Sequence, residues 1–266
     1  MSTPPKVLVI AGSDSGGGAG IQADVKSVMA NGAHATTVIT AVTAQNSQGV
    51  QGIWSLDLVA VRAQFRSVMD DIGADAIKVG MLGTRELVGE VSALLAPYAD
   101  SVPIVLDPVC ASKHGDPLLE QAALASLCSE LMPLATVVTP NIPEASLLLG
   151  VNADTTIEQS HAATELVRLG AAAALVKGGH ATDESAVDIL FDGDELRHFS
   201  AHRSSTEHTH GTGCTLASAI AARLAAGDLL VEAVAKAKEY ISGAIENGYA
   251  LGRGIGPVDH AWRWRQ

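Results

Sequence analysis

Short apolar runs alternate with amphipathic stretches along most of the chain. Residues 7–11 form a compact apolar run that ends at Gly12, which is typical of a strand buried on both faces. Apolar residues then recur at helical spacing from Ile21 to Met29, before the helix-ending pair Asn31-Gly32. The β-branched stretch 36–42 predicts a second strand. The N-terminal part therefore predicts a strand, a helix and another strand.

The same alternation continues toward the C-terminus. Asp57 is expected to cap a long helix whose apolar face extends to Ile72. An Asp192-Gly193 pair predicts a hairpin turn between strands 186–191 and 195–200. The remaining predicted elements are strands at 76–79, 103–106, 136–138 and 172–176 and helices at 156–169, 212–226 and 229–245.

This alternation predicts an α/β fold. We expect a single doubly wound, mostly parallel sheet with helices on both faces, in one domain that spans residues 1–266. Such sheets bind ligands at the carboxyl ends of their strands. The loops that follow the strands are therefore the places to search for chemistry.

Composition narrows the class of protein. Apolar residues make up 47% of the chain and charged residues 17%, a balance that excludes disorder. No apolar run reaches the roughly 18 residues of a membrane span. Lys and Arg number 17 against 29 Asp and Glu, with no basic cluster, so a nucleic-acid partner is not expected. Cys110, Cys128 and Cys214 form no CxxC pair, which favours a reducing, cytoplasmic location.

A glycine-rich loop, residues 12–20, joins the first strand to the first helix. Glycine in this position lets a ligand approach the backbone at a helix N-terminus. The spacing fits neither of two familiar nucleotide-binding patterns: Ile21 stands where GxGxxG needs its third glycine, and no Lys follows until Lys26. A purely structural strand-to-helix turn is the alternative.

A second glycine-rich turn, residues 208–214, precedes an Ala-rich helix. Gly211, Thr212 and Gly213 can direct consecutive backbone N–H groups into one anion hole at the positive end of the helix. Cys214 would stand in the first helical turn, where its pKa is expected to fall from about 8.5 toward neutral, as suits a general base. Two alternatives remain open: His208, His210 and Cys214 as metal ligands, and Cys214 as an inert buried residue.

Charged residues follow three further predicted strands. Asn141 and Glu144 fit either a helix cap or the placement of a hydrated Mg²⁺ and its phosphates. Asp107 ends a buried strand and precedes Lys113, and Lys177 follows another strand beside glycines. Because carboxyl ends of parallel strands meet at one edge of a sheet, these residues are expected on one rim.

Seven ordered sequence blocks resemble the ribokinase-type kinases, and specifically the hydroxymethylpyrimidine/phosphomethylpyrimidine kinases of thiamine biosynthesis. The blocks are AGSDSGGGAGIQAD at 11–24, TAQN at 43–46, KVGML at 78–82, LDPV at 106–109, TPNIPE at 139–144, VKGGH at 176–180 and THGTGC at 209–214. The tail GIGPVDH at 254–260 is also similar to the end of these enzymes.

The resemblance implies an activity and a set of residue roles. It implies transfer of a phosphoryl group from Mg²⁺-ATP to a hydroxymethylpyrimidine and then to its monophosphate, with Cys214 as the base for the first step. Gln45 would hydrogen-bond the aminopyrimidine edge, with further substrate contacts from Gly12, Ala19, Met81 and Val109. Nucleotide and phosphate would contact Lys113, Asn141, Glu144 and Lys177, and the metal would contact Asp107 and, through water, Glu144. The resemblance also implies a homodimer.

Two rival functions and several departures accompany the resemblance. A pyridoxal kinase of the same fold would phosphorylate a similar hydroxymethyl group, but pyridoxal lacks the donor-acceptor edge that suits Gln45. A non-catalytic pyrimidine or nucleotide sensor is disfavoured by the intact turn and Cys214. The sequence departs from the family pattern at Cys110, Ser112, His114 and His208, near the expected phosphate rim.

Overall fold

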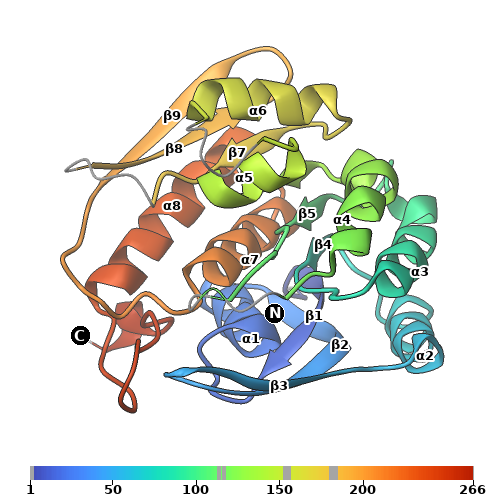
Figure 1. Cartoon of the computed structure of the whole chain (residues 1–266), viewed down its shortest axis with the longest axis horizontal. Helices are drawn as coiled ribbons and strands as arrows, with labels where there is room; N and C mark the ends of the chain where they lie inside the picture. Colours follow the sequence, from blue (N-terminus) through green and yellow to red (C-terminus); the bar gives the residue numbers. More distant parts are fainter. Residues whose placement is uncertain (1–2, 113–114, 116–117, 152–156, 180–184, 266) are drawn as a thin grey trace.

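The computed structural model describes residues 3–112, 115, 118–151, 157–179 and 185–265. In this part of the chain, nine strands form one sheet in the order β3-β2-β1-β4-β5-β6-β7-β8-β9 (Figure 1). The strands are β1 (Lys6–Asp14), β2 (His34–Asn46), β3 (Gly49–Ser55), β4 (Ala76–Val79), β5 (Ile104–Leu106), β6 (Val137–Val138), β7 (Ala174–Val176), β8 (Ser185–Phe191) and β9 (Leu196–His202).

The six central strands from β2 to β7 are parallel, and the outer strands are antiparallel. β1 pairs in parallel with both β2 and β4, and β4 to β7 continue in parallel. β3 pairs antiparallel with β2, while β8 and β9 extend the other edge as an antiparallel hairpin. The chain order reverses between β1 and β4, which makes their carboxyl ends the switch point where such sheets bind ligands. The predicted mostly parallel fold is confirmed.

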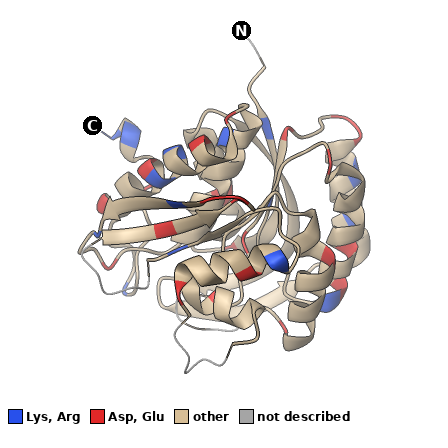
Figure 2. Cartoon of the chain, turned by 90° about the horizontal axis from the view of Figure 1, so that it is seen from above, with Lys and Arg blue, Asp and Glu red and all other residues tan. Residues whose placement is uncertain are grey.

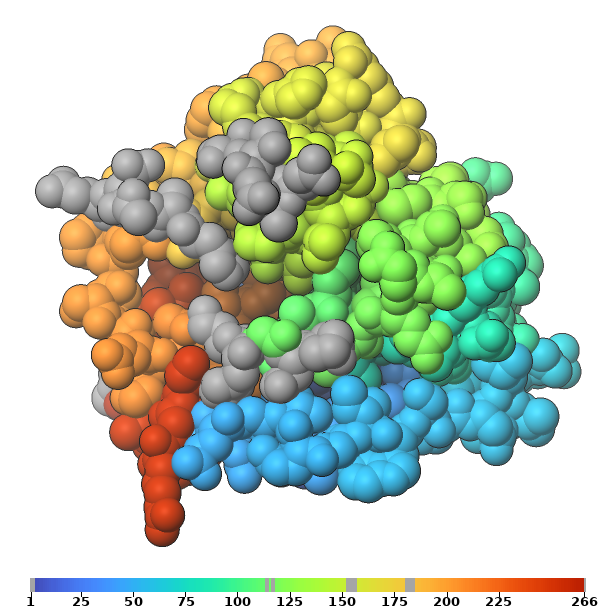
Figure 3. Space-filling model, viewed as in Figure 1, coloured from blue at the N-terminus to red at the C-terminus, as the bar shows by residue number. Residues whose placement is uncertain are grey.

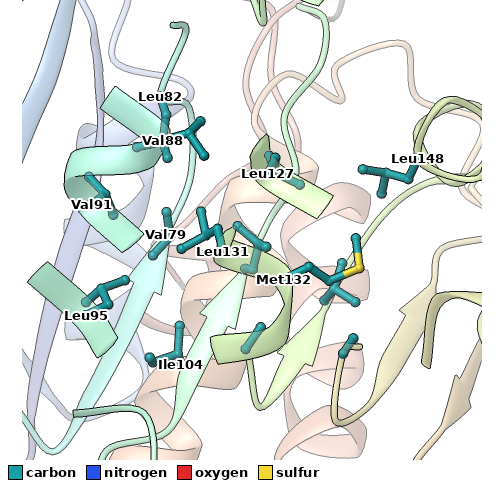
Figure 4. Close-up of a cluster of buried hydrophobic side chains, with 14 of the residues drawn as sticks. Val79, Leu82, Val88, Val91, Leu95, Ile104, Leu127, Leu131, Met132 and Leu148 are labelled. Carbon is teal, nitrogen blue, oxygen red and sulfur yellow. The ribbon is translucent and has the colours of Figure 1, made fainter. Parts of the chain in front are cut away.

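Helices cover both faces of the sheet. They are α1 (Gly20–Ala30), α2 (Leu58–Met69), α3 (Arg85–Leu95), α4 (Gln121–Ser126), α5 (Ile142–Leu148), α6 (Gln159–Arg168), α7 (Thr212–Ala225) and α8 (Leu230–Glu246). One buried cluster joins α2 to α6 to one face, and a second joins α1, α7 and α8 to the other. Figure 4 shows part of the first cluster, in which Val91 and Leu95 of α3 lie near Val79 and Ile104 of the sheet.

The sequence located most elements but missed one strand. β2 continues to Asn46, beyond the predicted end at residue 42, because its last residues pair with β3. β3 had no clear signal, since Gly49, Gln51 and Gly52 interrupt its apolar residues. The predicted helix at 156–169 is observed as α6, and its predicted first residue lies outside the described part. Asp57 caps α2 as predicted, accepting a hydrogen bond of 2.7 Å from the backbone N–H of Ala60.

The charges are spread over the molecule. Figure 2 shows Lys and Arg interspersed with the more numerous Asp and Glu, with no dense basic patch in that view. None of the helices in the described residues combines the length and apolar character needed to cross a membrane.

Candidate active site

A cavity of about 530 Å³ opens at the carboxyl ends of the strands. Figure 3 shows the surface hollowed between β2–β3, in light blue, and α5, in yellow-green. The cavity is bordered by both glycine-rich segments, by the ends of β1 and β4, and by α8. The loops that the sequence singled out therefore meet at one place.

Asp14 organises the first glycine-rich loop. Its Oδ1 accepts a hydrogen bond of 2.7 Å from Gly16, and its Oδ2 accepts from the backbone N–H groups of Gly18 and Ala19 at 3.0 and 2.8 Å. Burial opposes the charge of Asp14, but the hydrogen bonds from His210 and from this backbone outweigh it and lower the pKa of the carboxyl group. The loop is therefore held around a carboxylate, which the sequence reasoning did not identify.

The second glycine-rich turn packs against the first. His210 Nε2 lies 2.9 Å from Asp14 Oδ2 and 3.5 Å from Gln45 Nε2. Gly211 has a φ of +83° and begins α7 as its N-cap, so the backbone N–H groups of Thr212 and Gly213 lie at the positive end of that helix. The Thr212 N–H also donates to the carbonyl oxygen of Thr209 at 3.4 Å, and the anion hole stays a prediction.

The residues expected to bind the pyrimidine belong to the lining of the cavity. Gly12, Ala19, Gln45, Met81 and Val109 all border it. A Cβ at Gly12 would lie 2.5 Å from Met81 Cε, so the side chain of Met81 occupies the space that glycine leaves open. The Gln45 side-chain oxygen accepts a hydrogen bond of 3.2 Å from Thr43, and its amide faces the cavity near His210. The structure thus brings these five residues together.

A charged cluster lies at the opposite side of the turn. Lys177 Nζ is 3.0 Å from Asp107 Oδ1 and 3.9 Å from Glu144 Oε2. Asn141 and Glu144 form a reciprocal capping box at the start of α5, with both hydrogen bonds at 2.8 Å. The helix-cap interpretation of this pair is therefore correct, and both residues also border the cavity. Lys113 and His114 lie outside the described residues.

The charged cluster has unusual acid-base properties. Burial raises the pKa of Glu144 to about 7, although Lys177 acts in the opposite direction. Burial also disfavours the Lys177 ammonium, but Asp107 and Glu144 outweigh this effect and raise its pKa. A buried glutamate that titrates near neutral pH is sensitive to any cation placed beside it.

Cys214 stands in the first turn of α7, as predicted, but its expected pKa was wrong. The residue keeps part of its surface open and borders the cavity. Burial nevertheless raises the pKa of the thiol to about 12; Lys78 lowers it, and Asp24 and Asp107 raise it. The removal of water around the sulfur outweighs the influence of Lys78, so the site favours the neutral thiol.

The alternative zinc site is not supported. Within the described part of the chain, no three His, Cys, Asp or Glu side chains converge as a metal-binding group. His208 Nδ1 accepts a hydrogen bond of 3.2 Å from Gly256, and His210 Nε2 is engaged by Asp14. These two histidines therefore serve the packing of the turn.

Two buried ion pairs at the cavity were not predicted from the sequence. Lys78 pairs with Asp24 at 2.9 Å, and Lys238 of α8 pairs with Asp188 of β8 at 2.8 Å. Asp188 also accepts a hydrogen bond of 2.9 Å from Gly178 in the loop after β7. The available signal was a single charged residue on an otherwise apolar strand or helix face, which does not reveal its partner.

The acidic residues suit a metal that arrives with phosphates. Asp107 Oδ1 accepts hydrogen bonds from Lys177 and Thr139, whereas its Oδ2 would lie 3.5 Å from a Cβ at Gly213. Carboxylate oxygens are the ligands that Mg²⁺ prefers, and Mg²⁺ keeps several of its waters. Asp107 and the near-neutral Glu144 therefore fit a hydrated Mg²⁺ shared with phosphate oxygens rather than a cage made of protein alone.

Comparison with known proteins places the whole arrangement in a family. A family model described as phosphomethylpyrimidine kinase matches residues 14–259. A hydroxymethylpyrimidine/phosphomethylpyrimidine kinase from Streptomyces coelicolor is 55% identical over 260 residues, which cover 98% of this chain and 96% of the relative. The structure of Bacillus subtilis pyridoxal kinase with ADP superposes with a TM-score of 0.91 at 36% identity, covering 99% of this chain and 100% of the other. A phosphomethylpyrimidine kinase structure from Clostridium difficile gives 0.79 at 40% identity, covering 91% and 99%.

Proposed function

Because the chain belongs to the phosphomethylpyrimidine kinase family, we propose that it phosphorylates 4-amino-5-hydroxymethyl-2-methylpyrimidine to the monophosphate and then to the diphosphate. The phosphoryl donor is ATP, and the product serves thiamine biosynthesis. The observation that carries the proposal is that a hydrogen-bonding wall around Gln45 and a helix-terminal anion hole with Cys214 face the same cavity.

The two ends of the cavity have different tasks in this proposal. The amide of Gln45 both donates and accepts, as the edge of an aminopyrimidine requires. Ala19, Met81 and Val109 supply apolar contacts around the ring, and Gly12 leaves room for the Met81 side chain. The apolar side chains of Ile241 and Ile245 on α8 border the far part of the cavity and suit the adenine of ATP. The phosphates then lie between these ends, beside the Gly211–Gly213 turn.

The first phosphorylation requires removal of a hydroxyl proton. The Cys214 thiol first loses its proton to solvent, and the resulting thiolate accepts the proton of the hydroxymethyl group. The substrate oxygen forms a bond to the γ-phosphorus, and the bond from that phosphorus to the bridging oxygen breaks, so ADP leaves with the electron pair. The backbone N–H groups of Thr212 and Gly213, together with Lys177 and Lys113, stabilise the charge on the transferring oxygens.

Asp107 and Glu144 are the residues that would hold Mg²⁺, the latter through water, and Asn141 would position the phosphates beside them. The metal neutralises charge on the ATP phosphates when bound. The second phosphorylation needs no base, since the attacking phosphate oxygen is already ionised. Cys214 therefore acts in the first step alone.

The test is mass spectrometry of products after incubation with Mg²⁺-ATP, with hydroxymethylpyrimidine and pyridoxal offered in separate reactions. We expect the pyrimidine to gain one and then two phosphates. Phosphorylated pyridoxal without a phosphorylated pyrimidine would instead assign the chain to the pyridoxal kinases, to which its fold is also close. Absence of product from both substrates, with ATP unconsumed, would favour a sensor.

We also propose that the chain forms a homodimer in a reducing, cytoplasmic setting. Val42 and Trp54 are cross-strand neighbours of β2 and β3, and their side chains are 44% and 61% exposed. Large exposed apolar side chains on two neighbouring strands at the edge of the sheet suit an interface between copies. The three cysteines are unpaired, as a reducing compartment favours. Sedimentation equilibrium of the parent and of Trp54→Lys tests the dimer, which we expect the substitution to weaken.

A further inference from the structure

Lys78 is a fully buried cation that borders the cavity. Its Nζ lies 2.9 and 3.1 Å from the two carboxylate oxygens of Asp24 on α1, and neither side chain has any exposed surface. Asp24 Oδ1 also accepts a hydrogen bond of 2.7 Å from Ser218 on α7. Because Ser218 is one helical turn beyond Cys214, the pair lies against the first turns of α7.

The ammonium of Lys78 lies next to the segments that carry Gly12 and Met81, two of the residues expected to contact the pyrimidine. A Cβ at Gly80 would lie 2.7 Å from Lys78 Nζ and 3.2 Å from the side chain of Ala11. Gly80 immediately precedes Met81, and Ala11 immediately precedes Gly12, the two residues that meet at the pyrimidine end. Lys78 and Ala11 both border the cavity. Lys78 therefore lies beside residues that are expected to contact the pyrimidine.

A buried ion pair of this kind need not contribute to the stability of the protein. A buried ion pair can often be replaced by well-packed neutral residues without loss of stability, because removal of two charges from water offsets their attraction. The ammonium also has three N–H donors. Asp24 accepts from two of them, and the described residues supply no hydrogen-bond acceptor for the third.

We infer that Lys78 is a positioning residue for phosphoryl transfer: its buried ammonium, held by Asp24, stabilises negative charge on the sulfur of Cys214. The inference rests on the proposed role of Cys214 as proton acceptor. The charged groups that act on Cys214 are Lys78 from β4, Asp24 from α1, Asp107 after β5 and Lys177 after β7.

The electrostatics of the thiol agree with this role. Burial is the strongest influence and raises the pKa of Cys214 to about 12, and Lys78 is the strongest influence that lowers it. The effect of Lys78 exceeds the opposing effect of Asp24. Removal of the whole pair therefore makes the thiolate harder to form.

The activity test neutralises the pair in two ways. Lys78→Met/Asp24→Leu replaces it with apolar side chains, and Lys78→Gln/Asp24→Asn replaces it with amides of similar shape. For both, we expect kcat of the first phosphorylation to fall by about 30-fold or more, with the pyrimidine KM changed by less than about threefold. The second phosphorylation should change little. If either variant melts cooperatively like the parent and keeps the parent kcat for the first step, the inference is wrong.

The control neutralises an ion pair away from the cavity. Arg62 of α2 and Glu90 of α3 are bridged at 2.6 Å, and neither borders the cavity. Arg62→Gln/Glu90→Gln should leave kcat of both steps unchanged. A loss equal to that of the Lys78 variants would assign their effect to general loosening and overturn the inference.

A second readout does not depend on turnover. The rate at which iodoacetamide alkylates Cys214, followed by peptide mass spectrometry, reports how readily the thiolate forms. We expect a fall of about tenfold or more in the neutral pairs and an increase in Asp24→Asn, which keeps the cation and removes its counter-ion. Cys110 and Cys128 serve as internal references for the alkylation rate. Faster alkylation of Cys214 in the neutral pairs, or slower alkylation in Asp24→Asn, would refute the inference. If the parent phosphorylates no pyrimidine while alkylation responds as expected, the proposed function fails and the electrostatic role of Lys78 stands.

Discussion

A Cβ atom at position 211 would lie 1.8 Å from the carbonyl oxygen of Gly18. The two glycine-rich segments, distant in the sequence, touch through their backbones at this point. A Cβ at Gly18 would in turn lie 2.4 Å from the ring of His210. The contact therefore fixes the anion hole at the start of α7 relative to the loop that Asp14 holds.

Gly211→Ala is expected to disable catalysis. The substitution adds an atom in a space where none fits and forces a side chain onto a residue with a φ of +83°, so the turn must move. Displacement of anion-hole donors costs about 100-fold or more in kcat. Steady-state kinetics of the first phosphorylation measure the effect.

Gly227→Ala is the matched control. Gly227 has a φ of +90°, but nothing lies within 4 Å of its Cβ position, and it does not border the cavity. The same backbone strain should lower the melting temperature slightly and leave kcat unchanged. Equal loss of activity in both variants would show that backbone strain beside either end of α7, rather than the contact with Gly18, causes the defect.

Cys214→Ala should separate the two phosphorylations. The first step loses its proton acceptor and should slow by about 100-fold or more, while the second should change by less than about fivefold. Because burial raises the pKa of this thiol to about 12, the thiolate fraction increases with pH throughout the neutral range. The parent's first step should therefore accelerate as pH rises from 7 to 9, and the Cys214→Ala enzyme should lack that dependence. Equal losses in both steps would remove Cys214 from the role of base.

Gln45→Met should change substrate preference. The substitution keeps the length of the side chain but removes the groups that match the aminopyrimidine edge. We expect the pyrimidine KM to rise by about tenfold or more and the kinetics with pyridoxal to change by less than about threefold. Gln51→Met is the control, since Gln51 lies on β3 and, among the described residues, its side chain hydrogen-bonds to Asn46 and Gly49 and does not border the cavity. Parallel losses with both substrates would contradict the assigned contact.

Glu144 should make stability depend on pH. Its pKa is about 4.5 when unfolded and is raised to about 7 in the folded protein by burial, so the folded state binds the proton more tightly. The free energy of unfolding should consequently fall as pH rises from about 4.5 to 7, by on the order of 3 kcal/mol. Urea denaturation of the parent and of Glu144→Gln across this pH range measures the fall in the free energy of unfolding. The part of the fall that Glu144 causes should be absent in the variant.

The same carboxyl group should report the metal. A divalent cation favours the ionised form, so Mg²⁺-ATP should reduce the pH dependence of stability in the parent but not in Glu144→Gln. An identical response of both proteins would place the metal elsewhere.

Two strands show which elements can be predicted from the sequence and which cannot. The strand at 76–79 was predicted with its observed bounds, because Ala76, Ile77 and Val79 form a short apolar run although the buried Lys78 stands between them. β3 was missed, because its pairing with β2 compensates for a glycine-rich sequence with weak strand preference. The family was predicted from ordered motifs and is confirmed. The roles of the individual site residues remain predictions.

The sequence by itself determined the alternation of elements, the family and the loops that meet at the cavity, because periodicity and motif order are local properties of a chain. Only the tertiary structure decided which charges are neighbours. It paired Asp14 with His210 and Lys78 with Asp24, and it reversed the expected shift in the pKa of Cys214. The physical reason is that a pKa depends on the water and the charges within a few ångströms of a group, and folding brings those from distant parts of the chain.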